Sequence, residues 1–227
     1  LIFDHDFIRT APARTLASGI ADALAKWYES SLSSGSSDDG FVRHAIQMAR
    51  VLRDQLLIDG YRAYLDSDSI EWARTIEGCA LNAGLVGGIG GAKCRTAAAH
   101  SIHNGLTQLN SSSRPLHGEL VGFGILVQLT LEERELNNQL AKQARIQLRE
   151  VLSKLGIPLT LEELGLDKIS NNDFNHSCIF TCNEISMTES LPFKINQKSL
   201  YSAIIATSKE GEVLTRKNQS TLIGQLN

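Results

Sequence analysis

Apolar residues recur at helical spacing along most of the chain. Near the start, Leu16, Ile20, Leu24 and Trp27 form one stripe of a helix that Thr10 caps and that runs to about residue 31. The same period predicts further helices over residues 41–57, 69–83, 95–109, 118–134, 136–155, 161–164, 171–181 and 197–208. Only residues 1–8, "LIFDHDFI", have the pattern of a strand. The periodicity therefore predicts an all-α fold preceded by one short strand.

Two stretches interrupt this regular pattern. Residues 120–131, "LVGFGILVQLTL", are apolar on every side but too few to span a bilayer, so we predict a buried helix. Residues 84–91, "GLVGGIGG", are rich in glycine. Lys93 stands where a dinucleotide-binding fingerprint needs glycine. We therefore interpret the glycines as a sharp connection with close backbone approach rather than as a phosphate cradle.

Composition narrows the class of protein. The chain has 227 residues and a net charge of -3, with no block of Lys and Arg, so we expect neither a nucleic-acid nor a membrane partner. Four scattered cysteines in a chain of this size favour a reducing cytoplasm. Cys178 and Cys182 lie near His176, which invites a zinc site, but a second cysteine pair is missing. We predict that they are buried helix cysteines.

Residues 97–106, "AAAHSIHNGL", carry two histidines three positions apart. On a helix, His100 and His103 lie on one side, and the small alanines before His100 leave room for another element or a ligand. The pair is either part of a metal site or a polar helix face whose rings are hydrogen-bonded or solvated. This segment alone leaves both readings open.

Two further residues have the right chemistry for a metal. His117 begins an apolar helix, where the helix dipole favours a neutral imidazole. Asp22 lies off the apolar stripe of its helix, among glycine and alanine neighbours. The simpler alternatives are a cap-region histidine and an ion pair of Asp22 with Lys26. One Asp and two His suit Zn²⁺ or Fe²⁺ and leave positions open for water or substrate, but spacing alone leaves open whether they meet.

Three segments in order carry a family resemblance. They are "APARTLASGIADALAKWYES", "AAAHSIHNGLTQL" and "LHGELVGFGILVQLTLE". Together they resemble the C-terminal helical domain of glycerol dehydrogenases, in the iron-containing (group III) alcohol dehydrogenase superfamily. The resemblance implies the helical bundle of the dehydroquinate synthase-like fold over residues 10–227. It also implies that residues 1–9 end a nucleotide-binding domain that is missing from the chain.

The resemblance also implies roles for individual residues. The family's metal-binding aspartate falls on Asp22, and its metal-binding histidines fall on His100 and His117. Lys26 stands where many iron-type relatives have a further histidine, which favours Zn²⁺, with Fe²⁺ as the alternative. His103 then becomes a neighbour of the ligands and a candidate proton relay.

The implied reaction is that of an NAD-dependent polyol or alcohol dehydrogenase. Hydride passes from a metal-bound alkoxide to NAD, and His103 carries the proton away. Because the resemblance assigns NAD(H) binding mainly to the missing domain, we expect the chain alone to show no turnover, and measurable dehydrogenase activity would contradict this. The segment before the histidines, with Lys93 and Arg95, departs from the family pattern, so we expect an anionic or otherwise altered substrate as the alternative to glycerol.

Two other functions remain as alternatives. A dehydroquinate-synthase-like lyase shares the fold, but it needs a denser set of Lys and Arg for a phosphorylated, carboxylated substrate. A helical assembly domain that has kept the fold and lost the chemistry is the non-enzymatic alternative. In each case we expect a homo-oligomer in the cytoplasm.

Overall fold

The computed structural model describes residues 2–225, with side chains up to residue 216. All regular structure in this part of the chain is helical, as the periodicity predicted for the residues after the first eight. The helices are α1 (His5–Arg9), α2 (Ala13–Ser34), α3 (Gly40–Leu65), α4 (Ile70–Glu77), a π-helical segment (Gly78–Asn82), α5 (Ala83–Gly90), a 3₁₀ segment (Gly91–Cys94), α6 (Ala98–Leu106), α7 (His117–Leu136), α8 (Gln139–Lys154), α9 (Asn171–Cys182), α10 (Ile185–Thr188) and α11 (Gln197–Gln225).

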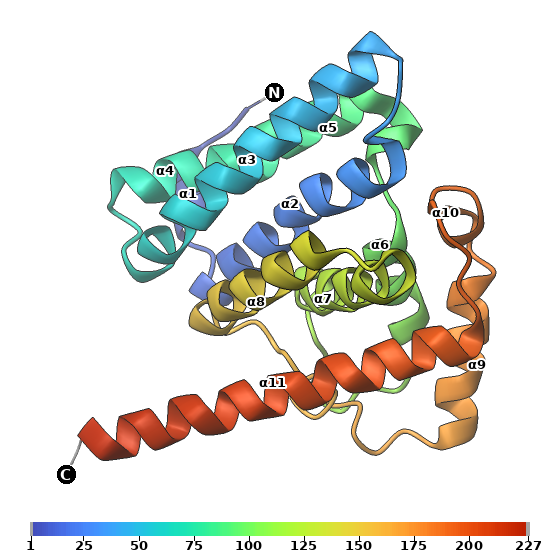
Figure 1. Cartoon of the computed structure of the whole chain (residues 1–227). Helices are drawn as coiled ribbons and strands as arrows, with labels where there is room; N and C mark the ends of the chain where they lie inside the picture. Colours follow the sequence, from blue (N-terminus) through green and yellow to red (C-terminus); the bar gives the residue numbers. More distant parts are fainter. Residues whose placement is uncertain (1, 226–227) are drawn as a thin grey trace.

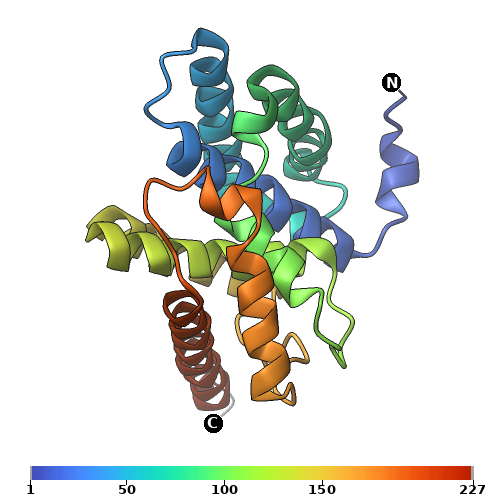
Figure 2. The same ribbon diagram turned by 90° about the vertical axis from the view of Figure 1, so that its right-hand side faces the viewer.

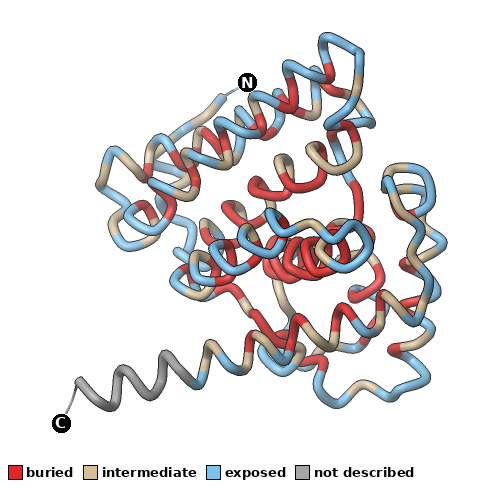
Figure 3. The backbone as a smooth tube through the Cα atoms, in the orientation of Figure 1, coloured by how far each residue is buried: buried red, intermediate tan, exposed pale blue. Residues whose placement is uncertain are grey.

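Helix α7 runs through the middle of the molecule and separates two cores (Figures 1 and 3). Val121 and Ile125 face one core, built with α2, α3 and α8. Phe123 and Val127 face the other, built with α6, α9 and α11. Because both sides of α7 are covered, the buried helix predicted from its apolar sequence is confirmed. Within residues 2–225, neither α7 nor another helix is both long and apolar enough to cross a bilayer.

The strand expected over residues 1–8 is wrong. Residues 5–9 form α1 instead, at the edge of the bundle (Figure 2). The Asp4 carboxylate accepts the Phe7 N–H at 3.0 Å and so caps the helix, and Arg9 pairs with Asp6 one turn earlier. A strand also needs a partner strand, and residues 2–225 supply none. The division of residues 1–9 from 10–227 stays a prediction.

The glycine-rich run is mostly helix rather than a turn. Residues 83–90 form α5, and the chain turns sharply only at Gly91, whose φ is 61°. Close approach is confirmed at Gly90, where an added Cβ would lie 2.9 Å from the Ala45 Cβ of α3. The run therefore lets α5 pack closely on α3.

Two further helix predictions, for residues 161–164 and for the end of the last helix, differ from the structure. Residues 161–164 form a turn rather than a short helix, because the chain reverses at Gly165, whose φ is 68°. The Glu163 N–H donates to the Thr160 hydroxyl at 3.0 Å within this turn. The last helix, predicted to end at residue 208, continues as α11 to residue 225.

Candidate metal centre

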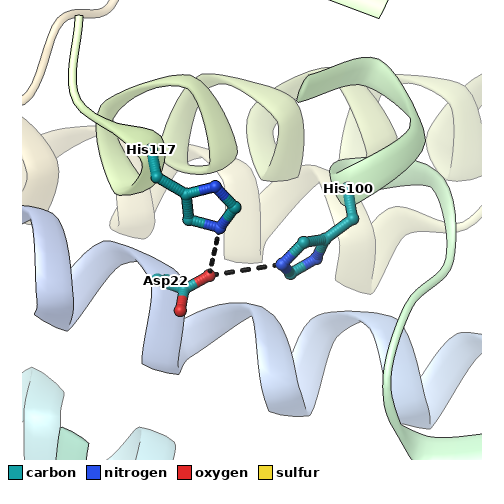
Figure 4. A group of neighbouring side chains, drawn as sticks. All are labelled: Asp22, His100 and His117. Carbon is teal, nitrogen blue, oxygen red and sulfur yellow. Dashed lines mark hydrogen bonds and ion pairs between the residues drawn. The ribbon is translucent and has the colours of Figure 1, made fainter. Parts of the chain in front are cut away.

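Asp22 lies on α2, away from the apolar stripe that packs into the core. Ile20 of the stripe is fully buried, whereas the Asp22 side chain is 36% exposed. Its Oδ1 atom lies 3.2 Å from Nε2 of His100 and 3.2 Å from Nε2 of His117 (Figure 4). The carboxylate therefore contacts two imidazoles rather than forming the ion pair with Lys26 that the spacing allowed.

The alanines before His100 are core residues at the start of α6. Ala97, Ala98 and Ala99 are fully buried. An added Cβ on Gly124 of α7 would lie 2.5 Å from the Ala99 carbonyl oxygen, so the two helices touch at backbone level. Another helix thus fills the room beside the alanines, and its approach fixes His100 relative to α7.

His117 is the first residue of α7, and the contact of its neighbour with α2 sets its position. The Gly118 N–H donates to the Ser18 hydroxyl at 3.0 Å. An added Cβ on Gly118 would lie 1.8 Å from the Ser18 carbonyl oxygen, so this approach requires glycine. Because Ser18 lies one turn before Asp22, the same contact brings the His117 ring over the Asp22 carboxylate.

A salt bridge between the exposed Arg14 and the buried Glu119 reinforces this junction of α2 and α7. Glu119 accepts the Leu116 N–H at 2.7 Å at the start of α7. Its two oxygens also accept Nε and Nη2 of Arg14 at 2.6 and 2.7 Å. Burial raises the pKa of Glu119, but these bonds and the Arg14 charge hold it below its usual value. The charged pair ties the first turn of α2 to the first turn of α7.

The ligand atoms of Asp22, His100 and His117 are close enough to hold one metal ion. One ligand atom of each residue lies within 4.8 Å of the ligand atoms of the other two, and this holds within the part of the chain that the structure describes. Tetrahedral zinc with bonds of about 2.1 Å separates neighbouring ligand atoms by about 3.4 Å. The two observed separations of 3.2 Å from the Asp22 Oδ1 atom are close to that value. One carboxylate oxygen and two imidazole nitrogens therefore fit a zinc-sized ion.

The contacts between Asp22 and the histidines shift the pKa of Asp22 down and that of His100 up. Burial alone raises the pKa of Asp22, but the hydrogen bond from His100 and the charges of His100, Lys26 and His117 bring it below its usual value. Burial lowers the pKa of His100, but hydrogen bonds to Asp22 and Glu29 raise it to about 9. The His100 proton stabilises the two carboxylates, and a bound cation would take over that role.

The chain is similar to known oxidoreductases in both sequence and structure. An uncharacterized oxidoreductase of Synechocystis sp. is 46% identical over 92% of this chain. Glycerol dehydrogenase of Thermotoga maritima is 30% identical over 96% of it. The crystal structure of glycerol dehydrogenase from Schizosaccharomyces pombe superposes with a TM-score of 0.81 and 28% identity, covering 95% of this chain and 55% of that one. The chain is a relative of the glycerol dehydrogenases.

The match is limited to part of each relative. The chain spans 54% of the Synechocystis protein and 59% of the Thermotoga enzyme. No family model matches the chain. Both the helical fold and the resemblance read from the three motifs are confirmed, and the metal ligands stay a prediction that the geometry supports.

His103, the candidate proton relay, is held by a short hydrogen-bond chain. The Glu184 carboxylate only accepts, so the Asn104 amide nitrogen donates to it at 3.1 Å. The Asn104 oxygen then accepts Nδ1–H of His103 at 3.0 Å, which leaves Nε2 as the basic nitrogen. Burial lowers the pKa of His103, and the neighbouring imidazoles of His117 and His100 lower it further. The ring lies against His117, with centroids 4.2 Å apart.

Lys93 and Arg95 are less well placed than their sequence neighbourhood suggested. The Lys93 carbonyl accepts the hydroxyls of Ser33 and Ser34 near the end of α2, about three turns beyond Asp22. Arg95 lies over α5, its Cγ 3.8 Å from an added Cβ on Gly87. The structure therefore gives little support for a pocket made cationic by these two residues.

Cys178 and Cys182 lie on α9, apart from the candidate centre. Cys178 is buried, Cys182 is half-buried, and both are free thiols. Burial raises the pKa of Cys178 to about 12, with the neighbouring Cys182 adding to the effect. The prediction of helix cysteines is confirmed, although Cys182 is less buried than expected.

Glu29 is a further residue of the candidate centre that was not predicted from the sequence. This residue is 1% exposed, and its Oε2 atom lies 2.6 Å from Nδ1 of His100. It follows Asp22 by seven residues, so two helical turns bring it to the same side of α2. That spacing is the only signal of it in the sequence.

Proposed function

We propose that this chain is the metal-binding catalytic part of an NAD-dependent polyol or alcohol dehydrogenase, similar to glycerol dehydrogenase. One observation carries the proposal. Asp22, His100 and His117 come from three helices, in the order that the family resemblance assigns, and their ligand atoms converge on one point. The relatives named above are oxidoreductases, which favours this function over a lyase.

Each residue has a defined part in the proposed reaction. Asp22, His100 and His117 hold a divalent metal, zinc in preference to Fe²⁺. When bound, the metal polarises a substrate hydroxyl as a Lewis acid and lowers its pKa. His103 accepts the hydroxyl proton at Nε2. NAD, when bound, would supply the hydride acceptor. The His117 side chain is 52% exposed, so we place the substrate's approach on its side of the site.

The substrate we propose is a small polyol or alcohol. Two further relatives of the chain are a glycolaldehyde reductase of Halobacterium salinarum, 32% identical, and hydroxycarboxylate dehydrogenase A of Escherichia coli, 30% identical. We propose that NAD(H) binds mainly to the part of such enzymes that this chain does not span. Because the relatives act on different substrates, the metal site is the first element to test.

Metal analysis of the purified protein tests the proposal. We expect one zinc per chain, and loss of that zinc in each of the variants Asp22→Ala, His100→Ala and His117→Ala, because each removes one ligand. His44→Ala, on the exposed face of α3, is the matched control and retains the metal. His103→Gln also retains it, because His103 is proposed to move a proton rather than to bind. Wild-type protein that binds no stoichiometric zinc or iron would contradict the proposal.

A further inference from the structure

Glu29 does more than fill space in the core. Its Oε1 atom accepts the backbone N–H groups of Ala97 at 2.7 Å and His100 at 3.0 Å. Its Oε2 atom accepts Nδ1–H of the His100 ring at 2.6 Å. Both oxygens are therefore engaged by the first turn of α6, and the ring is held together with its own backbone.

The chemistry of this contact determines which ring nitrogen is free. An ionised carboxylate has acceptors and no donor, so the proton of His100 must stay on Nδ1. In the neutral ring the lone pair is then on Nε2. That atom lies 3.2 Å from the Asp22 Oδ1 atom and faces the candidate centre. The carboxylate thus selects the tautomer that can bind a metal there.

The ring also has little freedom to turn away. Its side chain is 13% exposed, and Nδ1 and Nε2 each meet a carboxylate of α2. Because Asp22 and Glu29 both belong to α2, one rigid helix fixes both ends of the imidazole. Metal-binding histidines commonly depend on such a partner, whose loss weakens metal binding about 10–100-fold.

We infer that Glu29 is a positioning residue that fixes the orientation and tautomer of His100 for metal binding. The inference rests on the metal site proposed above. A purely structural role, as a cap for the first turn of α6, is the competing explanation. The two explanations differ in what happens when the carboxylate becomes an amide of the same shape.

Glu29→Gln separates them. The amide oxygen can still accept the two backbone N–H groups, so α6 keeps its cap. The amide NH₂ then faces Nδ1 and donates to it, which moves the ring proton to Nε2 and blocks the ligand atom. We expect zinc affinity, measured by competition with a chelator, to fall about 10–100-fold. We expect the matched control Glu132→Gln, another buried glutamate outside the site, to change it less than threefold.

A second measurement needs no variant. In zinc-loaded wild-type protein, nitrogen NMR of His100 should show a protonated Nδ1 and a zinc-bound Nε2. Zinc on Nδ1 would overturn the inference, as would a Glu29→Gln variant that binds zinc as tightly as wild type. Wild-type protein that binds no zinc would instead overturn the proposed function itself, so the two failures can be told apart.

Discussion

Two buried glutamates of the structure have opposite surroundings. Glu29 on α2 is 1% exposed and accepts three N–H groups from α6. Glu132 on α7 is 8% exposed and accepts one, from the Gln128 side chain at 3.0 Å. Gln128 connects the two regions, because it also accepts the Ala99 N–H and donates to the Tyr28 carbonyl.

The difference shows how a core tolerates a carboxyl group. Burial raises the pKa of Glu132 to about 7, and the bond from Gln128 opposes this only in part. Glu132 can therefore stay neutral in the fold, whereas the three donors around Glu29 are arranged for a carboxylate. We conclude that Glu29 organises α6 and the candidate centre. Glu132, in contrast, lowers the stability of the fold once the pH exceeds the pKa of this group in the unfolded chain.

The largest expected effect comes from deleting the Glu29 carboxylate. Glu29→Ala leaves three buried donors unpaired at the start of α6, so we expect the free energy of unfolding to fall by about 3–5 kcal/mol. Urea unfolding of the zinc-free proteins measures this loss. Glu132→Gln serves as the control and should not be destabilised at pH 7. A loss below about 1 kcal/mol would mean that the three contacts are not a stabilising unit.

The next effect concerns Glu132 and pH. Its pKa is raised from 4.5 to about 7, so between these values the folded state holds a proton that the unfolded state has lost. Stability should therefore fall as pH rises through this window, by about 3 kcal/mol in all. Glu132→Gln, which cannot titrate, should match wild type at pH 4 and exceed its stability at pH 8, as measured by urea unfolding at both values. A constant difference between the two proteins at all pH values would contradict a raised pKa.

The smallest effect tests the connection between the two regions. Gln128→Met removes the acceptor of the buried Ala99 N–H and the donor to Glu132, at an expected cost of about 1–2 kcal/mol. Losing that donor should raise the pKa of Glu132 further, so the loss of stability extends to higher pH. Titration of the Glu132 carboxyl carbon by NMR measures the shift. We expect zinc affinity to change less than in Glu29→Gln, and an equal loss would mean that the two regions act as one unit.

The sequence predicted what depends on local pattern. The periodicity of α2 and the apolar character of α7 were sufficient to place both helices, and the family motifs nominated Asp22, His100 and His117. The prediction of an N-terminal strand was wrong because it followed the apolar residues of the first segment and did not take Asp4 as a helix N-cap. The glycine run was misread as a turn because glycine lowers helix propensity, whereas packing of α5 on α3 overrides it.

Glu29 could not be predicted for a different reason. An acidic residue on a surface helix is normally solvated, and nothing near Glu29 in the sequence marks it as buried. Its donors lie 68 and 71 residues later in the chain, so only the packing of α6 on α2 brings them together. Buried charge therefore depends on contacts that no local pattern records.

The position of the metal itself tests the central claim most directly. Crystals of the zinc-loaded protein, measured at the zinc absorption edge, would locate the ion by its anomalous signal. We predict one peak about 2.0–2.2 Å from an Asp22 carboxylate oxygen and from Nε2 of His100 and His117. A protein that binds zinc elsewhere, for example at Cys178 and Cys182, with no peak between these three side chains, would contradict the claim.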